Sequence, residues 1–281
     1  MHIKTVLAYL PSEELAEPVL QGAVALAKAH GAHVVGLHLE ASYYPAYGEV
    51  AIAMPPDVIE QMRKPLRERS KKLEERFKAR MADENISSEW RSGSTEYSSL
   101  PGRIVDEAVS ADMVLCPQVE AESVDVTTLD LPERLILEGG RPVLVIPPET
   151  AVQIPPKRVL IAWNNSPQAA RAVFDSLDLM KDAEAITVLS LAGDADERRA
   201  AEEHAGQLAA NLGRHGLHAK VEAVDIGNRS ASEYLRSRLD ADGADLMVMG
   251  CYGHSRFREL VFGGVTRDIL GGIKTPTVMS H

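Results

Sequence analysis

The sequence is an internal repeat, and this feature limits the fold more than any other. Apolar, β-branched runs begin at residues 5 and 158, 153 residues apart, and a turn and a helical pattern follow each. Further matched runs come in the same order, at 33–39 and 186–191, 86–91 and 218–225, 111–115 and 244–248, and 141–146 and 275–279. Five strands that alternate with helices in each copy predict two tandem α/β domains, each a parallel, doubly wound sheet with right-handed crossovers.

The helices between these strands carry their own signals. In the second copy Ser166 can cap a helix whose first residue is Pro167, and in the first copy we expect the helix to begin at Pro18. Long charged stretches at about 60–84 and 195–215 predict two further helices. The offset between copies falls from 153 residues at the first strand to 133 and 134 at the last two, so the second copy is shorter, mainly between its second and third strands.

A proline-rich bridge at 147–156 separates the copies. We therefore expect domains at 1–149 and 156–281. The bridge is short, so the two domains should pack closely.

Composition excludes several classes of protein. The formal net charge is −11, which argues against a general binder of nucleic acid or of anionic membranes. A phosphate ligand would therefore have to be held by a local device, such as backbone N–H groups, rather than by a basic field. The two cysteines lie far apart, which excludes a disulfide scaffold and a CxxC site. No window resembles a signal peptide or a transmembrane span, and we expect a cytoplasmic protein.

A glycine-rich stretch follows the fourth strand of the second copy. Gly263 and Gly264 immediately precede a helical pattern, whose first N–H groups would be unpaired and would favour an anion. Thr266 adds a hydroxyl in the same turn. These residues can form a phosphate cradle, and the alternative is a loop that merely turns the chain.

The spacing of these glycines is that of a known family. Gly250, Gly253 and Gly263 stand as G-x2-G-x9-G after an Ala-Asp strand. The second half thus closely resembles the nucleotide-binding universal stress proteins, and the repeat makes the whole chain look like a tandem member. The resemblance implies a Rossmann-like sheet of five strands in each half, and ATP, AMP or another adenine nucleotide in the second half, with Mg²⁺ able to accompany ATP. It also implies that the last strands of the two halves pair, at 143–146 and 277–279.

The candidate binding residues follow from the match of motif and strand ends. They are Ala162, Asn164, Val188, Met249, Gly250, Gly253, His254, Arg256, Gly263, Gly264, Val265 and Thr266. Two of them depart from the family: Asn164 stands where it has Asp, and Gly264 where it has Ser or Thr. Both changes imply altered or weakened binding.

The first half lacks the pattern. Pro117 stands where the second half has Gly250, and Leu10 is matched to the family's Asp after the first strand. Acidic residues follow Pro117 and would repel phosphate. We expect this half to have lost the nucleotide site. Its tyrosine-rich segment, 43–47, either covers the degenerate cleft or binds a small apolar ligand.

Single histidine, arginine and cysteine residues allow further interpretations. His254 and Arg256 either contact phosphate or form a solvated face. Cys251 is either a redox-sensing thiol, its pKa lowered by a helix N-terminus, or a small residue in a turn, and Cys116 is expected to be buried. His33 and His38 would face opposite sides of a strand, and no metal-binding spacing occurs.

Nothing in the sequence pairs a nucleophile with a base. The main hypothesis is therefore a stress-response protein that binds a regulatory nucleotide, with at most slow ATP hydrolysis or autophosphorylation. The alternative is an adaptor or small-molecule binder that acts through the first half. A protein partner and a homodimer of the chain are left open.

Overall fold

The computed structural model describes residues 2–42, 56–96, 100–118, 131–251 and 264–281. The first half contains β1 (Thr5–Tyr9), α1 (Glu13–His30), β2 (His33–Ser42), α2 (Pro56–Asp83), β3 (Ser88–Glu96), α3 (Leu100–Ala108), β4 (Met113–Pro117), α4 (Leu131–Glu138) and β5 (Val143–Ile146). The second half contains β6 (Arg158–Ala162), α5 (Pro167–Asp175), α6 (Leu177–Met180), β7 (Ala185–Ala192), α7 (Ala195–Arg214), β8 (Ala219–Asp225), α8 (Ala231–Asp242), β9 (Leu246–Gly250), α9 (Gly264–Leu270) and β10 (Thr277–Ser280). Every predicted strand is present, and the two units are α/β with mainly parallel strands.

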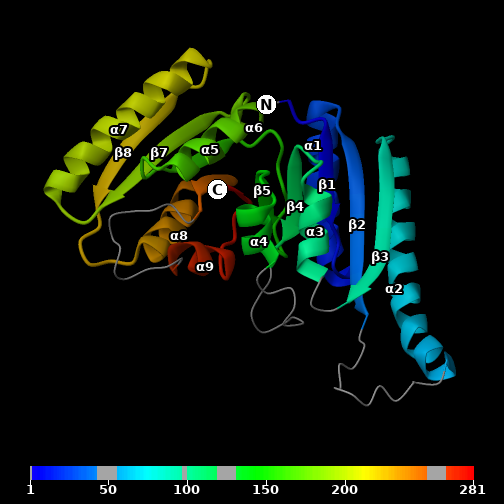
Figure 1. Cartoon of the computed structure of the whole chain (residues 1–281). Helices are drawn as coiled ribbons and strands as arrows, with labels where there is room; N and C mark the ends of the chain where they lie inside the picture. The colour runs from blue at the N-terminus through cyan, green and yellow to red at the C-terminus, as the bar shows by residue number, and fades with distance from the viewer. Residues whose placement is uncertain (1, 43–55, 97–99, 119–130, 252–263) are drawn as a thin grey trace.

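All the strands join in one sheet. Its order is β3-β2-β1-β4-β5-β10-β9-β6-β7-β8, and Figure 1 shows it running from β3 at one end to β8 at the other. Within each half the strands are parallel, whereas β5 and β10 pair antiparallel, with Leu144 opposite Val278. The predicted pairing of the last strands is confirmed. It removes two sheet edges that would otherwise be open to other chains.

The helix starts confirm one prediction and correct another. Ser166 caps α5, accepting a hydrogen bond from Ala169 N at 3.1 Å, and Pro167 is the first helical residue, as expected. The prediction that α1 begins at Pro18 is wrong, because Ser12 caps the helix and Pro18 lies inside it. The Ser12 side chain accepts from Leu15 N, and acidic residues fill the first turn, where the helix dipole favours them.

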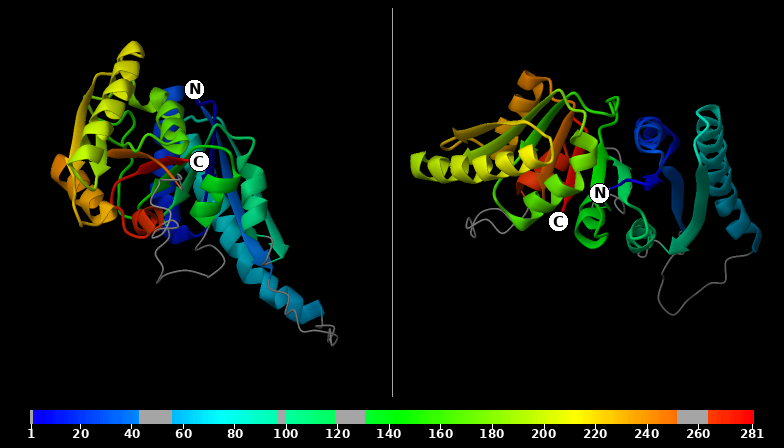
Figure 2. Two further views of the ribbon diagram at one scale, coloured as in Figure 1. Left: turned by 60° about the vertical axis from the view of Figure 1, so that its left-hand side comes forward. Right: turned by 90° about the horizontal axis from the view of Figure 1, so that it is seen from above.

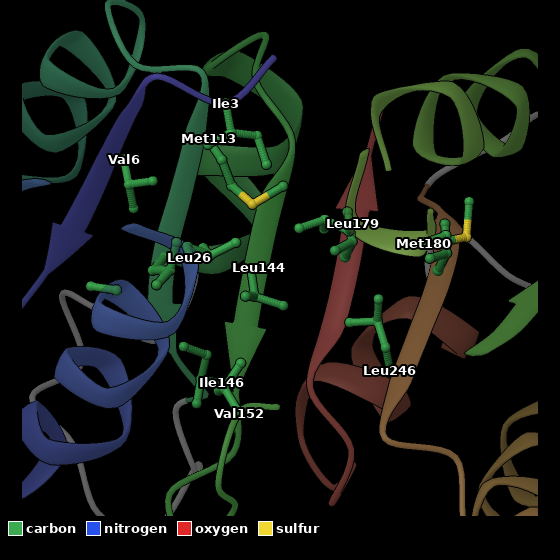
Figure 3. Packing of buried hydrophobic residues seen from close by; sticks show 14 of the residues in the cluster. Ile3, Val6, Leu26, Met113, Leu144, Ile146, Val152, Leu179, Met180 and Leu246 are labelled. Carbon is green, nitrogen blue, oxygen red and sulfur yellow. The ribbon is translucent and has the colours of Figure 1, made fainter. Parts of the chain in front are cut away.

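Helices cover both faces of the sheet, as the view from above shows (Figure 2). One apolar layer lies under α1, α2, α5 and α7, and the other under α3, α4, α8 and α9. Both layers run across the β5–β10 pair without a break. In Figure 3 the first layer contains Leu144 and Ile146 from the first half and Leu179 and Leu246 from the second. The two halves therefore share both apolar layers.

The C-terminal end of α1 lies where the two halves meet, because the charges of Lys181 and Asp178, in the second half, act on His30 there. Lys4 Nζ donates to the carbonyl oxygen of His30 at 2.9 Å, at the end of α1. Burial lowers the pKa of His30, and the charge of Lys181, which follows α6 in the second half, lowers it further. His30 is therefore held in its neutral form where the two halves meet.

The lowered pKa of His30 predicts a loss of stability in mild acid. The folded-state pKa of His30 lies below the unfolded value of about 6.5, so below that pH the unfolded chain binds a proton that the folded protein resists. We expect the free energy of unfolding to fall as pH decreases below 6.5, and to fall less steeply in His30→Gln. Urea unfolding of both proteins from pH 7.5 to 5 measures the difference. Equal slopes would show that His30 does not contribute.

Candidate functional site

The carboxyl ends of β6 and β9 mark the point where the strand order of the second half reverses. The chain goes from β6 to β7 on one side, while β9 lies on the other side of β6. The helices that follow these strands, α5 and α9, pack on opposite faces of the sheet. In α/β sheets a reversal of this kind leaves a crevice outside the strand ends, where ligands bind, and we use the word crevice for this end of the sheet.

A polar turn joins β6 to α5 at this crevice. Asn164 Oδ1 accepts from Ser166 Oγ at 2.7 Å and from Ser166 N at 3.3 Å, and Asn165 adopts a left-handed conformation with φ 55°. Asn164 is exposed. Because its carbonyl oxygen is used inside the turn, the side chain presents its NH₂ group to the outside. An aspartate could hold the same turn but would present a negative charge, so Asn164 favours ligand atoms that accept hydrogen bonds.

Partly exposed apolar side chains lie beside this turn. We call Ala162, Leu191, Met249 and Val265 the apolar shelf: all four belong to the layer under α8 and α9. Ala162 ends β6 next to Met249, and Leu191 lies near the end of β7. Ala162, Leu191 and Val265 remain partly open to solvent. The shelf offers an apolar surface of the kind that the flat face of an aromatic ring contacts.

Val188 lies apart from the shelf. It is 0% exposed and belongs to the layer under α5 and α7, on the opposite face of β7. Its side chain is therefore part of the core. The β7 residue at the crevice is Leu191, three positions nearer the end of the strand.

Gly250 has a packing role. A Cβ atom at this position would lie 2.2 Å from Ala169 N and 2.4 Å from Gln168 C, on the backbone of α5. The missing side chain lets the first turn of α5 lie directly on the end of β9. This requirement holds with or without a ligand.

Helix α9 brings Gly264, Val265 and Thr266 to the same edge of the sheet. Thr266 is 5% exposed, and its side chain hydrogen-bonds the thiol of Cys251. Its hydroxyl is therefore already used within the protein. The predicted residues Gly253, His254, Arg256 and Gly263 lie outside the described residues.

Burial decides the chemistry of both cysteines. It raises the pKa of the Cys251 thiol far above its ordinary value, and it raises the pKa of Cys116 to about 12. The prediction that a helix N-terminus lowers the pKa of Cys251 is wrong, because desolvation outweighs it. Both thiols stay protonated at neutral pH, which leaves the redox-sensing reading without support.

In the first half, buried side chains occupy the positions that are equivalent to those at the crevice of the second half. Strand register aligns Tyr9 with Ala162, and Tyr9 is 2% exposed, so its ring occupies the space that Ala162 leaves open. Register also aligns Pro117 with Gly250, as expected, and the buried Gln118 with Cys251. The residue that matches Asn164 is Pro11, however, because Leu10 N donates to Leu37 O just as Trp163 N donates to Leu189 O, which makes Leu10 equivalent to Trp163. The assignment of that position to Leu10 is corrected.

A buried histidine lies against the turn after β1, next to Trp90, which packs in the apolar layer on the opposite face of the sheet from Tyr9. His38 is 3% exposed, with Nδ1 2.7 Å from the carbonyl oxygen of Leu10 and Nε2 3.1 Å from Glu40 Oε1. Its ring stacks on that of Trp90, with the two ring centroids 6.4 Å apart. His33 instead contacts Ser87 Oγ, consistent with the opposite sides predicted for the two histidines. Within the described residues no three His, Cys, Asp or Glu side chains gather to hold a metal ion.

Three residues at the crevice of the second half are not among those predicted from the sequence. Leu191 could have been found from strand parity, once the end of β7 was known. His281 Nδ1 lies 3.0 Å from the carbonyl oxygen of Cys251, and Glu133, from the first half, accepts from Arg267 Nε at 3.1 Å. No local pattern indicates either contact, since the partners are 30 and 134 residues apart. Among the described helices, none has the length and apolar character needed to cross a bilayer.

Comparisons with known proteins agree with this architecture. Residues 156–281 match the model of the universal stress protein family. The whole chain resembles a universal stress protein from Archaeoglobus fulgidus DSM 4304, with a TM-score of 0.74 and 12% identity over 100% of this chain and 99% of that one. It also resembles a proposed universal stress protein from Pseudomonas aeruginosa UCBPP-PA14, with a TM-score of 0.60 and 14% identity over 99% and 93% of the two chains.

At these identities the structural likeness concerns the fold alone. No curated protein matches the sequence. The family match covers the half that holds the crevice and the apolar shelf. Residues 156–281 therefore form a universal stress protein domain, and the two α/β units give the chain the tandem architecture of such domains.

Proposed function

We propose that the second half binds an adenine nucleotide at the carboxyl ends of β6, β7 and β9, as a regulatory ligand in a stress response. The observation that carries this proposal is the contrast between the two crevices. In the second half Ala162 leaves the apolar shelf partly open, whereas in the first half Tyr9 fills the equivalent space. A purine ring needs an open apolar surface of this kind.

The polar groups around the shelf suit the rest of a nucleotide. The NH₂ group of Asn164 can donate to ribose or phosphate oxygens without adding negative charge. The chain is acidic, so backbone N–H groups rather than a basic field would hold the phosphates. The glycine motif lies between β9 and α9, which is where these phosphates would be placed.

Rapid turnover of the ligand is not part of the proposal. Three described hydroxyls at this edge belong to Ser166, Thr266 and Ser280. Those of Ser166 and Thr266 hydrogen-bond an amide and a thiol, and neither has a general base beside it. The Ser280 hydroxyl donates to Asp175 Oδ2 at 3.0 Å, but Ser280 is only 2% exposed, so a ligand does not reach it. The nucleotide would therefore act by occupying the site, with at most slow hydrolysis or autophosphorylation.

The direct test is titration of nucleotide-stripped protein with ATP and AMP, by calorimetry and by thermal melting, with and without Mg²⁺. At a ligand concentration one hundred times Kd we expect about 2.7 kcal/mol of stabilisation. GTP, which carries the other purine base, tests whether the site prefers adenine. Absence of both heat and stabilisation at millimolar ATP would reject the proposal and favour a nucleotide-independent role for the first half.

A substitution copied from the first half tests the placement. Ala162→Tyr should fill the apolar shelf as Tyr9 fills its own crevice, and should weaken ATP binding by at least about tenfold, because the ring loses its apolar contact. The fold should tolerate the change, since the first half carries tyrosine at this position. Ala210→Tyr, on the exposed face of α7, is the matched control and should bind ATP as the wild type does. Equal affinity of the two variants would show that the nucleotide lies elsewhere.

A further inference from the structure

A carboxylate from the first half lies beside the crevice of the second. Arg267 Nε, in α9, donates to Glu133 Oε1, in α4, at 3.1 Å. The Glu133 side chain is only 19% exposed, and its charge also acts on Cys251, whose pKa it raises together with burial. Figure 1 shows α4 and α9 next to each other where the two halves meet.

We propose that Glu133 is a positioning residue for the candidate site of the second half, where it locks the first turn of α9 against the end of β9. The turn includes Val265 and Thr266, and Arg267 follows them directly. Thr266 hydrogen-bonds the thiol of Cys251, which directly follows β9, while Arg267 forms an ion pair with Glu133 of α4. With these two contacts in place the turn cannot shift without breaking one of them. The consequence for nucleotide affinity rests on the proposed function, whereas the lock itself does not.

The ion pair joins equivalent positions of the two copies. Glu133 and Arg267 are 134 residues apart, the same offset that separates Leu144 from Val278, which face each other in the β5–β10 pair. Both pairs therefore join equivalent positions of the two copies across a pseudo-twofold axis. In a dimer of identical chains such a position meets itself, and two like charges would repel. A tandem chain can place Glu on one copy and Arg on the other.

The same symmetry predicts that the charges can be exchanged. Because the two positions are equivalent, the double variant E133R/R267E should form the pair in the reverse direction with similar geometry. Glu133→Arg alone would bring two cations together. Rescue by the double variant would separate a specific pair from a general effect of altering α4.

The two cysteines supply a measurement that needs no nucleotide. Cys251 lies under the first turn of α9, while the fully buried Cys116 lies in the first half. Labelling of the native protein with a thiol reagent, resolved by mass spectrometry, reports the opening of each site. We expect Glu133→Gln to speed labelling of Cys251 by up to about fivefold, as the loss of one partly exposed ion pair allows, and Glu133→Arg to speed it further. Labelling of Cys116 should not change.

Glu138→Gln is the matched control, because Glu138 pairs with Arg134 within α4 at 2.9 Å. It should leave both cysteines as in the wild type, and E133R/R267E should restore the wild-type rate at Cys251. An unchanged Cys251 rate in Glu133→Arg would overturn the lock. Equal acceleration of both cysteines would overturn it too, since that result would mean general destabilisation.

Nucleotide titration of the same proteins then tests the link to the site. We expect Glu133→Arg to weaken ATP binding and the double variant to recover it. If the wild type binds no ATP while Cys251 responds as expected, the proposed function fails and the lock stands. If ATP binding is the same in every variant although Cys251 responds, the positioning role for the ligand is rejected.

Discussion

Gly250→Ala should destabilise the protein by about 3 kcal/mol or more, even without any ligand. The added methyl group would lie 2.2 Å from Ala169 N and 2.7 Å from Ala169 Cα, so α5 must move off the end of β9. Helix α5 also packs on β10, and its displacement would disturb the joint between the halves. Thermal and urea unfolding followed by circular dichroism measure the effect, and the melting temperature should fall by roughly 6 °C or more.

Gly206→Ala gives the matched control. Gly206 lies inside α7, and beyond its chain neighbours and the backbone of its own helix a methyl group added there would meet no atom within 4 Å. There the change should stabilise the protein by up to about 1 kcal/mol, because alanine is the better helix former. If Gly250 served only to let a phosphate approach, Gly250→Ala would unfold like the wild type in the absence of nucleotide. The two glycines thus distinguish packing from ligand binding.

Leu144→Asp should have a comparable or larger effect, at the joint between the halves. Leu144 is 0% exposed, pairs with Val278 and lies in the apolar layer that crosses from one half to the other (Figure 3). The change removes a buried aliphatic side chain, which costs about 2–5 kcal/mol, and places a carboxylate where no cation is available among the described core residues. We expect a lower melting temperature and, because the edges of β5 and β10 become exposed, aggregation visible in gel filtration.

Leu137→Asp, on α4 near the same joint, controls for the added charge. Leu137 is already 40% exposed, so its replacement should change stability by no more than about 0.5 kcal/mol. Leu144→Asp with the melting temperature and elution of the wild type would mean that the halves fold and hold together without the β5–β10 core.

The strands and helices were predictable because their signals are local. Apolar runs with turns between them indicated every strand, and Ser166 and Pro167 marked the start of α5 in the sequence. Boundaries were less accurate. The third strand was expected at 86–91, whereas β3 extends to Glu96 with polar residues, since an edge strand needs little apolar surface.

The candidate site was predictable as a place but not in its details. The strand reversal and the glycine motif located the crevice, and Asn164, Met249 and Val265 lie at it. Val188 was misplaced because the face on which a strand residue lies depends on parity relative to the strand's end. Leu10 was aligned with the wrong residue because the two turns differ by one residue in length.

The repeat and its apolar periodicity were enough to establish two α/β units, since these signals come from neighbouring residues and from the pairing of like segments. The roles of individual residues at the crevice depend on how α4, α5 and α9 pack on the sheet. Gly250 makes room for α5, Thr266 is held by Cys251, and Glu133 reaches Arg267 from the other half. Each of these contacts joins residues that are distant in the chain and adjacent only after the sheet has formed, so packing rather than local pattern assigns them.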